Sequence, residues 1–418
     1  MKKNKIVIKL VIALIVVLFV TLIIGIYDEI EPFISNIIQD TIPKISLNRN
    51  ANSRNNSNNI EESILSNKEK QLCMEICPYV TYRGKVYYEI YGKKIFENDI
   101  YLNLSDVKID DQLEENLKML PKIREVELYN QNLTKEQKIK LQESFPNVKF
   151  KWKVEILGEE VDWSVETLDF SKRIINDIEE FKNSLKLLPN LKKLDMSYTN
   201  LTNEQLGELR ILFPNIRIDW VVHMSKWSVR TDAVAFSVLI YTYDYRRMTT
   251  EDIQVLKYCT ELQALDLGHQ AIEDITVIGQ YLPKLRVLIL ADNNIKDISP
   301  LANLKHLHYL ELFMNNITDS TPLASCKELV DLNISFNYRF SDISGILNLP
   351  KLERLWLISD NISKESYSLI RQTYPNVTLV TTGNGSTNSG WRTHERYYAM
   401  IDMYRKNYIS DVFLKYDN

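Results

Sequence analysis

The sequence predicts an α/β solenoid with a parallel sheet on its concave face, preceded by an N-terminal transmembrane helix. Three observations predict this class. A leucine-containing segment recurs every 22 to 23 residues in the third quarter of the chain, a longer unit of about 66 to 70 residues recurs upstream, and residues 10–26 carry no charge. Repeats of this kind stack, because one repeat alone cannot bury enough apolar surface to offset the entropy of ordering it.

The first 27 residues predict a cytoplasmic basic tip and a signal anchor. Four lysines lie among the first nine residues, and the uncharged run 10–26 approaches the length that crosses a ~30 Å hydrocarbon core. No small-x-small cleavage site follows the run, which favours an uncleaved anchor over a cleaved signal peptide. Basic residues before the span and acidic residues after it place the N-terminus inside. We therefore expect a single-pass cell-membrane protein with an extracellular C-terminal domain.

Residues 28–70 predict a juxtamembrane helix and a linker. Apolar residues from Ile30 to Ile38 fall at helical spacing, so this stretch either lies on the outer membrane surface or prolongs the transmembrane helix. Residues 48–59, NRNANSRNNSNN, are polar and without periodicity, which is typical of a tether that does not fold.

The next part, residues 71–258, predicts long-period units. The segment LPKIREVELYNQNLTKEQKIKLQESFPN begins at Leu120, and LPNLKKLDMSYTNLTNEQLGELRILFPN begins 68 residues later at Leu188. Each reads as a strand followed by a helix that stops at Phe-Pro-Asn, with a hairpin-like insertion between units. We expect these units to join the shorter repeats in one continuous solenoid.

Residues 259–380 contain the short repeats. LRVLILADNNIKDISPL from Leu285 and LHYLELFMNNITDSTPL from Leu307 share the frame L-x-x-L-x-L-x-x-N-x-I-x-D-I-x-x-L with three further copies. These segments resemble the 22-residue leucine-rich repeats of internalin-like bacterial surface proteins. The resemblance implies a leucine-rich repeat array whose function is to bind another macromolecule.

One polar position of the repeat predicts a structural ladder. Asn293, Asn315 and Asn337 recur where each strand ends, and a stacked row of amides satisfies the backbone of neighbouring turns. Gln270 and Asp360 take this position in the outer repeats. Pro300 and Pro322 favour short 3₁₀ segments on the return path.

The last part, residues 381–418, predicts a Gly/Ser loop and a C-terminal capping helix. Tyr397, Ile401, Tyr404 and Tyr408 share one helical face. This helix either covers the exposed end of the array or forms an aromatic docking segment for a partner.

Composition and motifs argue against several other functions. The chain has 55 acidic and 51 basic residues, a net charge of −4, and no basic stripe for a nucleic acid. His306 and His308 lack a third ligand nearby, so we expect no metal, and we expect no cofactor or enzymatic activity. Cys73 and Cys77 are candidates for a disulfide, whereas Cys259 and Cys326 are expected to be buried thiols.

The concave sheet is the predicted partner-binding surface. Alternation along the strands directs several aromatic, apolar and charged residues outward: Ile289, Tyr309, Glu311, Phe313, Asp331, Arg354, Trp356 and Ile358. Aromatic residues with arginine are typical of interaction hot spots. Two alternatives stay open for this surface: the aromatics pack along the sheet, or the C-terminal helix covers them. The expected partner is a protein or another envelope macromolecule, and the rival functions are a structural envelope spacer, a self-assembling scaffold, or a surface hydrolase.

Overall fold

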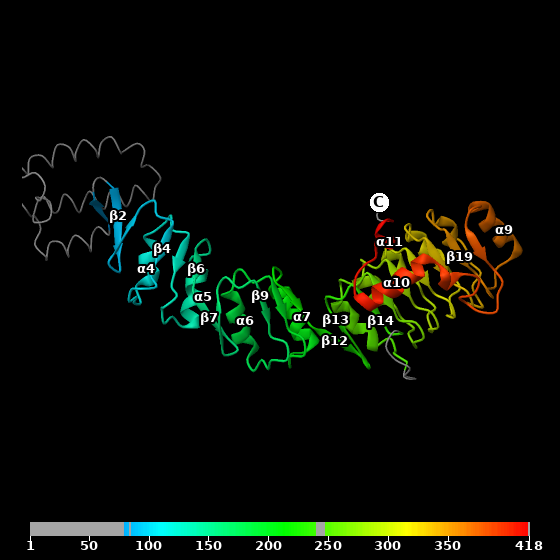
Figure 1. Ribbon diagram of the computed structural model, residues 1–418, viewed down its shortest axis with the longest axis horizontal. Coiled ribbons are helices and arrows are strands. Elements are labelled where there is room, and N and C mark those ends of the chain that lie inside the picture. Colours follow the sequence, from blue (N-terminus) through cyan, green and yellow to red (C-terminus); the bar gives the residue numbers. More distant parts are fainter. Residues whose placement is uncertain (1–78, 83–84, 240–246, 417–418) are drawn as a thin grey trace, which may run out of the picture. The chain divides into compact units, whose positions relative to one another are not determined.

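The computed structural model describes residues 79–82, 85–239 and 247–416 (Figure 1). The chain divides into two compact units, and all described residues belong to the second, residues 79–418. The predicted anchor 1–27, the linker 28–70 and the pair Cys73 and Cys77 lie outside the described residues. Within the described ranges, no helix is long and apolar enough to cross a membrane.

Parallel strands of three residues form the framework, as the repeats predicted, but within the described residues they build three sheets and not one. The first has the order β4-β5-β6, the second β11-β10-β9, and the third runs from β14 to β20 in sequence order. The strands of the two smaller sheets are β4 (Tyr101–Asn103), β5 (Glu125–Glu127), β6 (Lys149–Lys151), β9 (Thr167–Asp169), β10 (Lys193–Asp195) and β11 (Arg217–Asp219). The third sheet consists of β14 (Ala235–Ser237), β15 (Ala264–Asp266), β16 (Val287–Ile289), β17 (Tyr309–Glu311), β18 (Asp331–Asn333), β19 (Arg354–Trp356) and β20 (Thr378–Val380).

Antiparallel strands account for the breaks between the sheets. A hairpin follows β6, formed by β7 (Lys153–Ile156) and β8 (Glu159–Asp162), and another follows β11, formed by β12 (Val221–Met224) and β13 (Trp227–Arg230). The described part of the chain begins with β1 (Tyr79–Tyr82), β2 (Lys85–Ile90) and β3 (Lys93–Phe96), which are also antiparallel. Buried Trp152 and Trp220 start the two hairpins, and their carbonyls accept from the backbone N–H groups of Trp163 and Thr231. The hairpin takes the chain away from the parallel sheet, so the next parallel strand starts a new sheet.

The helices of the long-period units are α4 (Leu113–Lys118), α5 (Lys135–Ser144), α6 (Ile178–Lys186) and α7 (Asn203–Leu212). Both α5 and α7 begin with a capping box, in which Thr134 pairs with Gln137 and Thr202 with Gln205. Each of these two helices ends before a Phe-Pro pair, because proline disfavours the helical conformation of the residue that precedes it.

The seven-stranded sheet has leucines at the middle of most strands, and these pack into the main core. Leu265, Leu288, Leu310, Leu332 and Leu355 lie in register across the sheet and are all buried. The return path beneath them uses η1 (Asp252–Tyr258), α8 (Thr276–Tyr281), η2 (Ser299–Asn303), η3 (Thr321–Ser325), η4 (Ile346–Asn348) and α9 (Lys364–Thr373). Pro300 and Pro322 lie in the first turns of the 3₁₀ helices η2 and η3, as predicted.

The three ladder asparagines connect successive repeats through their side-chain amides. The Nδ2 of Asn315 donates to the carbonyls of Leu290 in the preceding repeat (2.9 Å) and Leu312 in its own (3.0 Å), while its Oδ1 accepts from the N–H of Ile295 (3.0 Å). Asn293 and Asn337 make equivalent bonds. The residue before each ladder position has a positive φ, from 52° to 62°, so the backbone turns sharply where the strand ends.

The chain ends with η5 (Trp391–Thr393), α10 (Glu395–Lys406) and α11 (Asp411–Leu414). The buried residues of α10 are Arg396, Met400, Met403 and Tyr404. Tyr404 of the predicted face is therefore buried as expected, whereas Tyr397 and Ile401 are half-buried beside Arg396 and Met400. Tyr408, the last residue of the predicted face, lies beyond the helix and is exposed. The helix contacts β14 and β15, so it lies against the seven-stranded sheet and does not cap the end of the array beyond β20 (Figure 1).

Candidate functional site

The candidate site is the face of the seven-stranded sheet that points away from the leucine core, called here the sheet face. Two rows of residues in register form it. One row runs Ala235, Ala264, Val287, Tyr309, Asp331, Arg354 and Thr378, and the other runs Ser237, Asp266, Ile289, Glu311, Asn333, Trp356 and Val380. Phe313 and Ile358 follow the second row, two residues beyond Glu311 and Trp356.

All eight residues predicted to form an open partner-binding surface lie on the sheet face, and all eight are buried. Ile289, Tyr309, Glu311, Phe313, Asp331, Arg354, Trp356 and Ile358 are at most 6% exposed. The expectation that they face solvent is therefore wrong for this structure. The cover is the chain's own C-terminal segment, residues 383–416, which was one of the two alternatives that the sequence left open.

Aromatic and apolar contacts form the centre of this cover. Trp391 packs edge-on against Trp356, with ring centroids 5.0 Å apart, and lies 5.3 Å from the ring centroid of Tyr309. Met400 and Phe413 of the C-terminal segment join the same buried cluster. The cluster is separate from the leucine core, so the sheet is covered by apolar groups on both sides.

A buried charge cluster lies beside the aromatic centre. Asp331 accepts two hydrogen bonds from Arg354, at 2.8 and 2.7 Å, and two from Arg396 of α10, at 2.7 and 2.8 Å. The Arg396 guanidinium also pairs with Glu353 (2.7 Å) and donates to the hydroxyl of Tyr416 (2.7 Å). Bidentate pairing of this kind fixes both distance and orientation, so it sets the position of α10 on the sheet.

Two other buried acids on the sheet face have no cation in hydrogen-bonding contact among the described residues. The Oε1 of Glu311 accepts from the Tyr309 hydroxyl and from Trp391 Nε1 (2.7 Å), whereas Oε2 has no hydrogen-bond partner in the described part of the chain. Asp266 accepts from Ser237 Oγ (2.7 Å) and from the N–H of Gly268 (3.0 Å). Burial raises the pKa of both the Asp266 and the Glu311 carboxyl groups.

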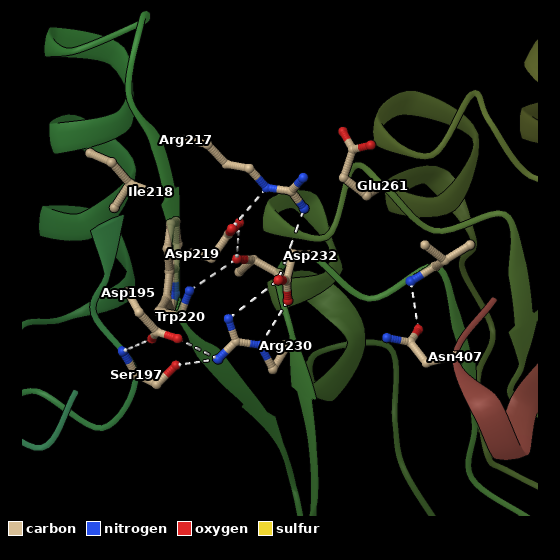
Figure 2. A network of polar contacts seen from close by, with 12 residues as sticks. Asp195, Ser197, Arg217, Ile218, Asp219, Trp220, Arg230, Asp232, Glu261 and Asn407 are labelled. Atoms are coloured by element: carbon tan, nitrogen blue, oxygen red, sulfur yellow. Dashed lines mark hydrogen bonds and ion pairs between the residues drawn. The ribbon is translucent and has the colours of Figure 1, made fainter. Parts of the chain in front are cut away.

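Hydrogen bonds to backbone groups hold the C-terminal segment at two places. The carbonyl of Asn388 accepts from Trp356 Nε1 (2.9 Å), and that of Ser386 accepts from Asn333 Nδ2 (2.8 Å). Farther along the segment, Oδ1 of Asn407, labelled in Figure 2, accepts from the N–H groups of Val234 (2.8 Å) and Ala235 (3.1 Å). The segment therefore crosses the sheet from β19 to its edge strand β14.

A polar network lies close to this edge and joins it to the second sheet (Figure 2). Arg230 donates to Asp195 Oδ2 (2.9 Å) and Ser197 Oγ (2.9 Å) and pairs with Asp232 (2.8 Å). Arg217 donates to Asp219, which also lies near Thr231. These contacts connect the ends of β10 and β11 with the link from β13 to β14, which is a structural role.

The remaining candidate residues do not form a reactive site. His308 is buried while His306 is exposed, and no group of three or more potential metal ligands occurs among the described residues. Cys259 and Cys326 are buried free thiols, and burial raises their pKa to about 12 and about 11. A thiol that stays protonated is a poor nucleophile.

Sequence reasoning missed the residues that the C-terminal segment contributes: Trp391, Arg396 and Asn407. Arg396 interrupts the apolar side of its helix, so the predicted face included Tyr404, which is buried, but not Arg396. The sequence did contain one signal for Arg396, namely its acidic partner on the sheet. A carboxylate expected on an aromatic sheet face, such as Asp331, needs a cation if that face is covered.

The chain was compared with protein families, with solved structures and with curated proteins. Residues 283–325 match the family described as Leucine Rich repeats (2 copies), which confirms leucine-rich repeats in this part of the chain. Among solved structures, the chain is similar to an internalin (inlF) from Listeria monocytogenes, with 19% identity, coverage of 68% of this chain and 69% of that one, and a TM-score of 0.32. Internalin C2 (inlC2) of the same organism shares 24% identity over 54% of this chain and 85% of its own, with a TM-score of 0.29. A leucine-rich-repeat protein from Leptospira interrogans shares 17% identity over 63% of this chain and 74% of its own, with a TM-score of 0.31. No curated protein matches the chain.

Proposed function

We propose that this chain is a membrane-anchored, extracytoplasmic leucine-rich-repeat protein that binds another protein through the sheet face, and that the C-terminal segment occupies this face until the partner displaces it. The observation that carries the proposal is the covered sheet face itself. It holds a helical segment through an aromatic centre and a buried Asp331–Arg396 pair, and these are the features of a protein–protein hot spot.

The linker between the repeats and the C-terminal segment has a composition that would allow the segment to leave the sheet face. Residues 383–390, GNGSTNSG, contain three glycines and no large apolar side chain. Asn333 and Trp356 of the sheet hold this connection by donating to two of its carbonyls. A helix of a partner that carries a guanidinium toward Asp331 and an aromatic ring toward Trp356 would reproduce the contacts of the segment, and so would compete with it.

The proposed location of the protein rests on the N-terminal sequence. Residues 1–27 carry the basic tip and the apolar run of a signal anchor, which supports a single-pass cell-membrane protein with its repeats outside. The test is fractionation of cells that express the chain with and without residues 1–27. The full chain should stay in the membrane after a high-salt wash and be cleaved by protease added outside. A full chain that is protected from the protease would contradict this location.

The binding proposal is tested with a variant that loosens the segment. Trp391→Ala/Arg396→Ala removes the aromatic and ionic contacts of the segment while leaving Asp331 paired with Arg354. The matched control, Tyr398→Ala/Lys406→Ala, changes two exposed residues of the same helix. We expect the loosened variant to retain a specific protein from envelope extract more strongly than the control does.

A synthetic peptide of residues 391–416 separates specific binding from adhesion to an uncovered apolar surface. The peptide should release the captured protein from the loosened variant, because both occupy the sheet face. Capture that is the same for variant and control, or that the peptide leaves unchanged, would argue against the proposal. That outcome would favour a structural envelope spacer.

A further inference from the structure

A pocket of about 260 Å³ lies between the sheet face and α10. Its apolar walls include Ile289 and Ala291 from the sheet and Met400 from the helix. Exposed Leu239 and Arg392 also line it, so the pocket reaches the surface. Its volume suits a molecule smaller than the drug-sized ligands that fill pockets of about 300–1,000 Å³.

Two fully buried carboxylates, Asp266 and Glu311, also line the pocket. They differ from Asp331 on the next strand, which is neutralised by two guanidinium groups. Neither Asp266 nor Glu311 forms an ion pair in the part of the chain that the structure describes, and Oε2 of Glu311 has no hydrogen-bond partner there. A buried carboxylate without a cation is costly, so a cationic ligand would find a strong binding contribution at this place.

The charged groups nearest to the pocket do not pair with these two carboxylates. Arg392 lies in the pocket lining and favours ionisation of both acids, but among the described contacts it forms no hydrogen bond or ion pair with either of them. His269 also lines the pocket, and its Nδ1 is 2.8 Å from Asp292. These two groups leave the inner end of the pocket acidic.

The spacing of the two acids restricts the ligand. Asp266 and Glu311 lie in register on either side of Ile289, two strands apart, which corresponds to about 9–10 Å between their Cα atoms. A ligand with a single positive charge can neutralise only one of the two carboxylates. A flexible aliphatic chain with an ammonium group at each end reaches both, and its methylene groups would lie on Ile289 and Met400.

We infer that this pocket binds a short aliphatic diamine, with one ammonium group against Glu311 and the other against Asp266. An ammonium group offers three donors, enough to satisfy Oε2 of Glu311. Because the ligand contacts both the sheet and α10, its binding stabilises the C-terminal segment on the sheet face.

The test is calorimetric titration of the full chain with 1,4-diaminobutane, with butylamine as the single-ammonium comparison. We expect saturable one-to-one binding of the diamine, at least tenfold tighter than that of butylamine, and a rise in the melting temperature. Glu311→Gln should weaken diamine binding at least tenfold, since the amide keeps an acceptor for Trp391 but removes the charge. Glu273→Gln, at an exposed carboxylate outside the pocket, should bind like the parent.

A second variant guards against a folding defect in Glu311→Gln. Ala291→Met extends a side chain into the pocket without changing any charge, and it should also abolish diamine binding. Three results would overturn the inference: no saturable binding by the parent, equal affinity for the diamine and butylamine, or unchanged affinity in both Glu311→Gln and Ala291→Met.

Discussion

At the scale of single residues, the sheet face shows how buried acids depend on their partners. Asp331 accepts four hydrogen bonds from Arg354 and Arg396, all three side chains being at most 7% exposed. Removing one member of such a cluster leaves the others uncompensated, which costs more than the cluster contributes relative to apolar residues. Replacing any one of these buried charges should therefore lower the stability of the fold.

We expect Asp331→Asn to lower the free energy of unfolding by about 3–5 kcal/mol, because the buried Arg354 guanidinium loses its counter-charge and Arg396 keeps only its pair with Glu353. Urea denaturation followed by circular dichroism measures the change. Asp297→Asn is the matched control, since Asp297 is exposed and an amide oxygen still accepts from the N–H of Ser299. A loss for Asp331→Asn no larger than for the control would show that the cluster adds nothing to stability.

Asp360, at the last ladder position, predicts a dependence of stability on pH. Burial raises its pKa from 3.8 to about 8. The folded chain therefore binds more protons than the unfolded chain between these values, so the free energy of unfolding falls as the pH rises from about 4 to 8. Asp360→Asn should remove this decline and also supply amide donors like those of Asn337. We expect the two chains to be about equally stable near pH 4, and the advantage of the variant to grow by up to about 1.4 kcal/mol for each pH unit toward pH 8.

Thermal unfolding of the parent and Asp360→Asn across this pH range tests the prediction. The difference between the two melting temperatures should grow with pH. A difference that stays constant would mean that Asp360 does not titrate with a raised pKa in the folded chain.

At the scale of elements, local sequence signals predicted those features that depend on neighbouring residues alone. Prolines at 300 and 322 predicted the 3₁₀ helices η2 and η3, and alternation in the repeats placed Tyr309 and Trp356 on one face of the sheet. The buried side of α10 was predicted only in part: Tyr404 is buried as expected, but Arg396 was missed because it is charged and its partner Asp331 lies 65 residues away. The pairing of two distant charges is a tertiary property that periodicity does not contain.

The stacking of return elements predicts a strict requirement for glycine at position 345. A Cβ atom there would lie 1.7 Å from the carbonyl oxygen of Ser320 in the preceding repeat, and backbone cannot yield as a flexible side chain does. We expect Gly345→Ala to lower the free energy of unfolding by about 3 kcal/mol or more, since overpacking typically costs about 1–3 kcal/mol and here it moves backbone.

The control is Gly385→Ala, where the new Cβ would meet only the side chain of Asn388, at 3.2 Å. Urea denaturation of both variants gives the comparison. Equal stability of the two alanine variants would show that successive repeats are not in tight contact at η3 and η4.

At the scale of the whole molecule, the sequence predicted the array but not the state of its sheet face. Eight residues were expected to face solvent because each repeat considered alone directs them outward. The C-terminal segment reverses this, with Trp391, Met400 and Phe413 completing a second apolar cluster over the sheet. Whether an aromatic surface binds a partner or is covered by the same chain depends on how tightly the repeats bind the C-terminal segment. That affinity cannot be predicted from the repeats or from the segment alone.

This cover predicts the behaviour of a chain that ends at Thr382. Without residues 383–418, the sheet face would expose Ile289, Tyr309, Phe313, Trp356 and Ile358 together, and contiguous apolar patches of this kind drive association. The leucine core on the other side of the sheet remains complete, so the truncated chain should still fold. We expect it to bind a hydrophobic dye and to sediment as oligomers at concentrations where the full chain does not.

Adding the peptide 391–416 in trans distinguishes an uncovered face from a damaged fold. The peptide restores the contacts to Trp356 and Asp331, so it should suppress both dye binding and oligomers, whereas the same peptide with Trp391→Ala and Arg396→Ala should not. A truncated chain that stays monomeric and binds no dye would mean that the sheet face needs no cover. An associated chain that the peptide leaves unchanged would mean that the segment belongs to the fold and cannot exchange with a partner.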